Sequence, residues 1–225
     1  MNENIAYFIG VLHSDGSIYL FNDRKRNRIQ HRFRIQVEEK SLPMVKKIQQ
    51  IFKQEFNRNI KIHFEGKNVY GNSIYYLQTS INRLLPNFSE IGITKTSIPD
   101  WVNSDAKMFC AYLAGLIDGD GDVCIKRPKY PQCRIRITSG KILNSLKLLV
   151  LKHIGSSLWI EPVIIDSVID IPPRKIHGKA FRHCFYVSSK NIKVIKNFVY
   201  PYIQIEHKKE LLCKFFKMKN KFNEN

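Results

Sequence analysis

Tyr7-Phe-Ile-Gly-Val-Leu-His-Ser-Asp-Gly16 and Tyr112-Leu-Ala-Gly-Leu-Ile-Asp-Gly-Asp-Gly121 are two copies of one sequence pattern. Each copy is an apolar run with a central glycine, and it ends in a small residue followed by Asp and Gly. Asp15 and Asp120 hold the same place in the two copies, about half the chain apart. A repeat of this period predicts two similar structural units.

Each copy also carries two small residues spaced four apart, which puts them on one face of a helix. These residues are Gly10 and Ser14 in the first copy and Gly115 and Gly119 in the second. Small residues at an interface let two helices approach more closely than the usual separation of about 8–10 Å. We therefore expect the two helices to pack together through these residues, with Asp15 and Asp120 at their ends. Gly16 and Gly121 are expected to end the helices as left-handed caps.

The expected position of the two aspartates is electrostatically unfavourable. A carboxylate at a helix C-terminus is disfavoured by about 0.3–1 kcal/mol, and two neighbouring carboxylates raise a pKa unless a cation intervenes. A divalent cation removes both problems, and a site with few oxygen ligands suits Mg²⁺. The predicted metal site therefore combines Asp15 and Asp120 with the backbone of Ser14 and Gly119. A tight helix pair with purely local capping is the alternative, and the duplication argues against it.

The second copy, Leu113-Ala-Gly-Leu-Ile-Asp-Gly-Asp-Gly121, resembles the LAGLIDADG motif of homing endonucleases, with Gly119 in place of Ala. The first copy, Phe8-Ile-Gly-Val-Leu-His-Ser-Asp-Gly16, is looser, because His13 replaces the sixth-position Asp and Ser14 the seventh-position Ala. The eighth-position Asp, which carries the chemistry of the family, stands in both copies. Two motifs in one chain resemble the monomeric, two-repeat branch of the family, and the resemblance covers essentially the whole length.

The resemblance implies an α+β fold of two pseudo-symmetric αββαββα repeats. Their antiparallel sheets would form a DNA-binding saddle, with the motif helices packed at its centre. The sequence of each half predicts a helix, a hairpin, a second helix, a second hairpin and a third helix, in this order. We expect an N-terminal repeat over residues 1–88, a linker over 89–104, and a C-terminal repeat over 105–225 that ends in a basic helix.

Apolar stripes predict the helices and alternating residues predict the strands. In the first half we expect helices over 5–13, from Ser41 onward and over 82–88, and strands over 17–22, 30–37, 60–64 and 73–80. In the second half we expect helices over 106–118, 141–154, 190–199 and 206–220, and strands over 122–127, 132–138, 158–165 and 181–188. A loop is expected around Pro172 and Pro173.

The second strand of each half has one apolar face and one face of Gln and Arg side chains. Arg and Gln suit guanine and adenine edges in the major groove, which admits a two-stranded ribbon. A solvated sheet face is the alternative, but the pattern occurs at matching places in both halves. The candidate DNA-reading residues, including some from the later strands, are Gln30, Arg32, Arg34, Gln36, Lys61, His63, Tyr76, Gln78, Lys126, Gln132, Arg134, Arg136, Arg182 and Tyr186.

The overall composition agrees with a nucleic-acid partner. Lys and Arg number 37 against 19 for Asp and Glu, a net charge of +18. This balance argues for a polyanion, although charge alone leaves ribosomal binding or membrane-surface attachment open. The five cysteines form no C-x-x-C pair, which argues against a zinc site. We interpret them as reduced residues of an intracellular protein; organelle, archaeal and bacterial compartments fit equally. No apolar run approaches the roughly 20 residues of a membrane helix.

The family also has a basic residue near each metal site. Lys40, just after the second strand, matches that place in the first half. Lys141 is its counterpart in the second half, displaced by one position. A surface lysine at the start of a helix is the alternative for both.

These features predict a monomeric, site-specific double-strand DNA endonuclease that uses Mg²⁺. Mn²⁺ is expected to substitute, and Ca²⁺ to support binding without cleavage. Metals held by the two aspartates would activate water and stabilise the leaving oxygen. The resemblance implies a staggered cut in a long asymmetric target and an intron-encoded gene. An RNA maturase that binds intron RNA on the same fold is one alternative. The other is a DNA-binding regulator with a degenerate site, which the presence of both aspartates disfavours.

Overall fold

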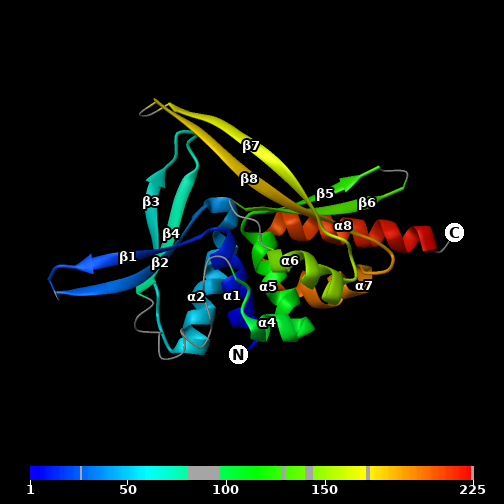
Figure 1. Cartoon of the computed structure of the whole chain (residues 1–225), viewed down its shortest axis with the longest axis horizontal. Helices are drawn as coiled ribbons and strands as arrows, with labels where there is room; N and C mark the ends of the chain where they lie inside the picture. Colours follow the sequence, from blue (N-terminus) through cyan, green and yellow to red (C-terminus); the bar gives the residue numbers. More distant parts are fainter. Residues whose placement is uncertain (26, 81–96, 128–129, 140–143, 171–172, 224–225) are drawn as a thin grey trace.

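A computed structural model describes the chain except residues 26, 81–96, 128–129, 140–143, 171–172 and 224–225. The described part contains two four-stranded antiparallel sheets. In Figure 1 the sheets extend to either side above a central group of helices. Buried residues from both halves form one hydrophobic core between the helices and the apolar sheet faces. This arrangement confirms the expected two-repeat α+β fold.

The first half contains the elements expected from its sequence. Its motif helix and first hairpin are α1 (Glu3–Ser14), β1 (Gly16–Asp23) and β2 (Arg28–Glu38). The 3-10 turn η1 (Glu39–Ser41) leads to α2 (Leu42–Phe56), β3 (Ile62–Lys67) and β4 (Ser73–Ser80). The strand order is β1-β2-β4-β3. The helix expected over 82–88 and most of the linker lie outside the described residues, and the end of the linker forms the short helix α4 (Asp100–Ser104).

The second half repeats this topology. Its first elements are α5 (Ala106–Asp118), β5 (Gly121–Lys126) and β6 (Gln132–Ser139), followed by α6 (Asn144–Leu149) and η3 (Val150–Ile154). The second hairpin is β7 (Trp159–Asp170) and β8 (Pro173–Val187), and the chain ends with α7 (Ile192–Val194), η4 (Ile195–Val199), η5 (Tyr200–Tyr202) and α8 (Glu206–Asn223). The strand order, β5-β6-β8-β7, matches that of the first sheet.

The strands on either side of residues 171–172 are longer than expected. β7 and β8 pair without interruption from Trp159 opposite Cys184 to Asp170 opposite Pro173. Pro173 is the first residue of β8, a position where proline is compatible with a strand. The residues of β7 beyond 165 include further β-branched residues, which favour a strand. The paired strands therefore extend to Asp170 and Pro173 and do not end near residue 165.

The two motif helices touch through their backbones. A Cβ atom added to Gly10 would lie 2.1 Å from the carbonyl oxygen of Tyr112, and one added to Gly115 would lie 2.2 Å from that of Tyr7. A Cβ on Gly119 would lie 1.9 Å from the hydroxyl oxygen of Ser14. The four small residues predicted for the helix interface therefore lie at it.

The predicted role of Gly16 and Gly121 as left-handed caps is wrong. Neither glycine has a positive φ, and each is the first residue of a strand. A Cβ on Gly16 would lie 2.5 Å from the carbonyl oxygen of Leu12, and one on Gly121 would lie 2.4 Å from that of Ile117. Glycine is needed here because the chain turns back against the last turn of the helix.

The C-terminal helix is docked, as its apolar stripe predicts. Leu212, Phe215 and Phe216 of α8 are buried in the common core. Within the described part of the chain, no helix has the length and apolar character needed to cross a membrane.

Replacing Gly115 with alanine tests the backbone contact. In the interior of a free helix this change stabilises by roughly 0.5–1 kcal/mol. Because the added Cβ would overlap the Tyr7 carbonyl oxygen, we expect Gly115→Ala to lower the free energy of unfolding in urea by about 1–3 kcal/mol. Gly10→Ala, at the equivalent place in α1, should lose a similar amount. A gain in stability in either variant would contradict the contact.

Candidate active site and nucleic-acid interface

Asp15 and Asp120 meet beside the ends of the two motif helices. Asp15 directly follows α1, and Asp120 follows α5 after one intervening residue. Burial, the charge of Asp120 and a hydrogen bond between the two carboxyl groups raise the pKa of Asp15 to about 7. Burial also raises the pKa of Asp120. The contact between these two carboxyl groups is therefore electrostatically unfavourable, and a divalent cation would stabilise it.

A lysine that sequence analysis missed lies against the end of α5. Lys208 of α8 is only 6% exposed, and its ammonium group donates to the carbonyl oxygens of Ile117 and Asp118 at 2.7 Å and of Gly119 at 3.3 Å. Its charge partly offsets the raised pKa values of Asp15 and Asp120, while burial lowers the pKa of the lysine itself. The ammonium group of Lys208 thus offsets the negative charge at the C-terminal end of α5 as well as that of the aspartate pair.

The sequence does contain a signal for this lysine. Lys208 precedes the buried residues Leu212 and Phe215 by four and seven positions, so it falls on the buried stripe of α8. A charged side chain at such a position is rarely buried without a partner. Because α8 contains several other lysines, its sequence does not single out Lys208, the one lysine that is buried in the described part of this helix.

Asp118, the sixth residue of the second motif, is a buried carboxylate that accepts three hydrogen bonds. The hydroxyl group of Tyr7 donates to Asp118 at 2.7 Å, and the backbone N–H groups of Gln204 and Ile205 donate to it at 2.7 and 3.2 Å. Burial raises the pKa of Asp118, while these hydrogen bonds lower it. Asp118 thereby connects α5 to α1 and to the segment that leads into α8.

The looser first motif forms the matching contact with a different side chain. His13 holds the sixth position there, and its Nδ1 atom lies 2.9 Å from the hydroxyl oxygen of Tyr112. Tyr7 and Tyr112 occupy the same place in the two motifs. Each motif therefore uses its sixth residue to bond the tyrosine of the other, and the histidine that departs from the family pattern has a structural role.

The donor set fits a metal ion that takes few protein ligands. Among the described residues, no group of three or more His, Cys, Asp and Glu side chains could hold a metal ion. Mg²⁺ is bound by one or two carboxylates and completes its shell with water and substrate phosphates, which matches the aspartate pair. Ser14 donates its hydroxyl group to Gly10 and Val11 at 3.1 Å, so only its backbone oxygen fits the predicted ligand role.

The two lysines predicted near the metal sites differ in what the structure describes. Lys40 is exposed in η1 and pairs with Glu38 at 3.1 Å. Burial lowers the pKa of His207, the neighbour of Lys208, and the charges of Lys208 and Lys40 lower it further. The catalytic role of Lys40 stays a prediction. Lys141 lies outside the described residues.

The polar faces of the central strands are largely as predicted. Arg32, Arg34 and Gln36 alternate with buried apolar residues on β2, as Gln132, Arg134 and Arg136 do on β6. The remaining candidates, which lie on or next to other strands of the two sheets, are also partly or fully exposed: Lys61, His63, Tyr76, Gln78, Lys126, Arg182 and Tyr186. Gln30 is the exception: only 4% of it is exposed, so it is not accessible to a duplex here.

Three of the predicted reading arginines are paired with carboxylates, which the strand pattern did not reveal. Arg34 pairs with Glu65, Arg136 with Asp122, and Arg134 with Glu161. A fourth, Arg32, lies over the ring of Phe21 at 3.5 Å. These partners come from neighbouring or more distant strands, so the polar sheet faces are less positively charged than their arginines suggest.

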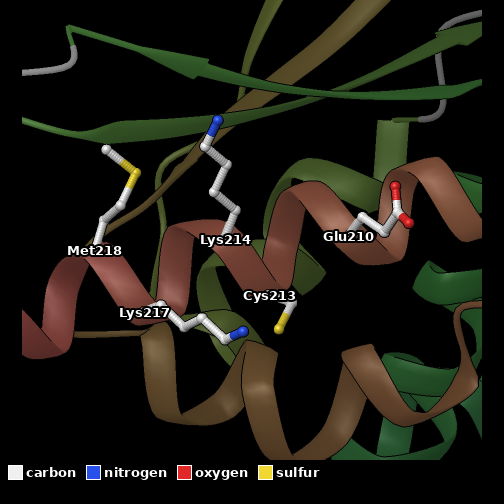
Figure 2. A pocket seen from close by; sticks show the side chains of 5 residues that line it. All are labelled: Glu210, Cys213, Lys214, Lys217 and Met218. Atoms are coloured by element: carbon white, nitrogen blue, oxygen red, sulfur yellow. The ribbon is translucent and has the colours of Figure 1, made fainter.

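A separate cavity of about 460 Å³ lies along α8, lined by Glu210, Cys213, Lys214, Lys217 and Met218. Figure 2 shows Lys214 and Met218 pointing toward the strands and Lys217 toward the helical turns on the opposite side. None of the predicted site residues lines this cavity. Glu210 is the one carboxylate among the lining residues named, so the cavity offers no second carboxylate for a metal ion. The aspartate pair and the polar sheet faces are therefore the stronger functional candidates.

Comparison with solved structures agrees with this geometry, although no protein-family profile and no curated protein matches the sequence. Mesophilic variants of the homing endonuclease I-DmoI match over 88% of this chain and 95% of theirs, at a TM-score of 0.54 and 20% identity. The LAGLIDADG homing endonuclease I-GzeII, in complex with its DNA target, matches over 99% of this chain and 92% of its own, at a TM-score of 0.56 and 13% identity. The chain has the LAGLIDADG homing endonuclease fold. A double mutant of I-SmaMI shares this fold over 98% of the present chain and 92% of its own, at a TM-score of 0.53 and 15% identity.

The two cross-helix hydrogen bonds can be compared directly. Tyr7→Phe leaves the buried Asp118 carboxylate without one donor, so we expect unfolding in urea at neutral pH to cost about 1–3 kcal/mol less free energy. Tyr112→Phe, which removes the matched bond to the His13 imidazole, should lose only about 0.5–1.5 kcal/mol. Equal losses in the two variants would show that the charge of Asp118 adds nothing to the contact.

Proposed function

We propose that the protein is a monomeric, site-specific double-strand DNA endonuclease that requires a divalent cation, Mg²⁺ in the first place. The observation that carries this proposal is the contact between the Asp15 and Asp120 carboxyl groups where two tightly packed helices end. A sheet with an arginine-bearing polar face lies on each side of these helices. Two carboxylates between two such faces are suited to phosphodiester hydrolysis.

Neighbouring structures support the substrate and the type of cofactor. I-DmoI has been solved in complex with DNA and Ca and in complex with DNA and Mn. A variant of I-DmoI has been solved with its target DNA in the presence of Mg. By analogy, Mn²⁺ should replace Mg²⁺ in the present protein, and Ca²⁺ should support binding without cleavage.

The residues of the chain would act together at this site. Asp15 and Asp120 would hold divalent cations, which when bound supply an activated water and stabilise the leaving oxygen. Lys208 lowers the pKa of both carboxylates and so favours their ionised, metal-binding form. The close helix contact fixes the separation of the two aspartates, because no side chain fits between the backbones at Gly10 and Gly115.

The two sheets would bind the two halves of the target. We place the N-terminal repeat at 1–88, the linker at 89–104 and the C-terminal repeat at 105–225, so that each repeat carries one sheet. The polar faces differ at matching places: Gln36 of β2 corresponds to Thr138 of β6 in the strand register. Different faces suit an asymmetric target.

An RNA maturase with the same fold is the second candidate. The neighbours named above are homing endonucleases, and the structures of I-DmoI and I-GzeII cited here contain DNA, which favours cleavage of DNA over binding of intron RNA. Equal gel-shift titrations with duplex DNA and with folded RNA would separate the two functions. Tight RNA binding without cleavage of any duplex would favour the maturase.

Charge neutralisation in the aspartate pair provides the main test. Duplexes selected by the protein from a random library in Ca²⁺ should be cut on both strands when Mg²⁺ replaces Ca²⁺. Asp15→Asn and Asp120→Asn keep the shape of the side chain but remove a metal-binding charge, so each should abolish or severely reduce cutting. Binding should persist, because phosphate repulsion is relieved.

Glu210→Gln is the matched control, since Glu210 is exposed on α8, its charge is not among the causes that shift the pKa of Asp15 or Asp120, and the change removes the same charge. It should cut normally. Full double-strand cutting by either aspartate variant would overturn the metal assignment.

Salt dependence tests the phosphate contacts. With a net charge of +18 and two basic faces, about 6–10 phosphate contacts should lower the affinity for duplex DNA by roughly 10³–10⁵ between 50 and 200 mM salt. Fluorescence titrations across this range provide the measurement. A nearly flat dependence would contradict binding along the two sheets.

A further inference from the structure

The polar face of the first sheet carries a cluster of charged and aromatic side chains. Arg34 of β2 pairs with Glu65 of β3, and its guanidinium carbon lies 4.1 Å from the centre of the Tyr76 ring on β4. Tyr76 stacks on His63, with ring centres 5.0 Å apart and planes 18° apart. These four residues are the first cluster, and together they hold Arg34 from its edge and from one face.

A comparable cluster stands on the second sheet. Arg134 of β6 lies 3.7 Å from the carboxylate of Glu161 on β7. The indole N–H of Trp159 donates to the same carboxylate at 2.9 Å, and the Trp159 ring centre lies 5.1 Å from that of Tyr186 on β8. The Trp159 hydrogen bond and the charge of Arg134 lower the pKa of Glu161. These four residues are the second cluster.

The two clusters share one layout. In each, the arginine comes from the second strand of its half and the carboxylate from the outer strand of the sheet. One strand lies between them, and it contributes Tyr76 in the first cluster and Tyr186 in the second. Neighbouring strands are about 4.8 Å apart, so each ion pair reaches across roughly twice that distance. In the strand register Arg34 corresponds to Arg136 and Arg134 to Arg32, so the two ion pairs span the same strands at different positions along them. Each half therefore has its own arginine held by a carboxylate of the outer strand.

Stability of the fold does not account for these ion pairs. The side chains of Arg34 and Glu65 remain 27% and 39% exposed, and those of Arg134 and Glu161 remain 13% and 36% exposed. Ion pairs with this much solvent contact contribute little to folding. An arginine already held in one orientation, however, loses less conformational freedom when it binds a ligand.

We propose that Glu65 and Glu161 determine the sequence specificity of the DNA interface, an inference that rests on the proposed binding of duplex DNA. The oriented arginine would donate to guanine and the carboxylate would accept from the amino group of cytosine, so each cluster fits a G·C pair. The carboxylate also cancels the charge of the arginine, which weakens its attraction to phosphates of any sequence. The paired carboxylates thus favour base contacts over phosphate contacts.

Glu65→Gln and Glu161→Gln test the proposal, because they remove the charge with little change of shape. Each variant and the unmodified protein would select duplexes from the same random library in Ca²⁺, and specific and non-specific affinities would then be measured. We expect each variant to lose a G·C preference in one half of the target, and the two variants to do so in opposite halves. The ratio of specific to non-specific affinity should fall about five- to 100-fold, mainly because non-specific binding tightens.

Glu210→Gln carries the same change of charge on α8 and should keep the base preferences of the unmodified protein. Circular dichroism would check that the variants fold, as expected for exposed positions. If the unmodified protein selects a sequence and Glu65→Gln and Glu161→Gln select the same one with the same affinity ratio, the specificity role fails while the proposed function stands. If the unmodified protein selects no sequence and binds duplex DNA weakly, the proposed function fails and the specificity role with it.

Discussion

The direct contact between the backbones of α1 and α5 is the constraint on which the rest of the structure depends. At Gly10 and Gly115 a carbonyl oxygen of the other helix occupies the place where a Cβ atom would stand. Because no side chain separates the helices there, their C-terminal ends lie together, and Asp15 and Asp120 come into contact. Each helix continues into the first strand of its own sheet, so the same contact also sets one sheet on either side of the aspartates.

The two halves have diverged where their surroundings differ. The sixth motif residue bonds a tyrosine across the interface in both, but it is His13 in one copy and Asp118 in the other. Asp118 is fully buried, and a carboxylate is acceptable there because two backbone N–H groups donate to it and Lys208 lies nearby. Those partners come from the segment before α8 and from α8 itself. A departure from the motif in sequence can therefore preserve the contact that the motif makes.

Local patterns in the sequence predicted the features that depend on local chemistry. The half-chain repeat, the small residues of the helix interface and the alternation of β2 and β6 all led to correct elements. Lys208 and the carboxylate partners of the arginines were missed, because those contacts join elements far apart in the chain. Gly16 and Gly121 were misread, since a glycine selected for close approach looks the same in sequence as one selected for a left-handed backbone.

The distribution of charge separates two tasks that a basic DNA-binding surface must perform. On the proposed function, the exposed lysines would supply most of the attraction to phosphates, which is independent of sequence. Three arginines on the sheet faces are already paired with Glu65, Asp122 and Glu161, so they add less to that general attraction. A neutralised arginine gains most where a base edge matches both its donors and the neighbouring acceptor. The carboxylates on a strongly basic protein are therefore as informative about sequence recognition as the arginines beside them.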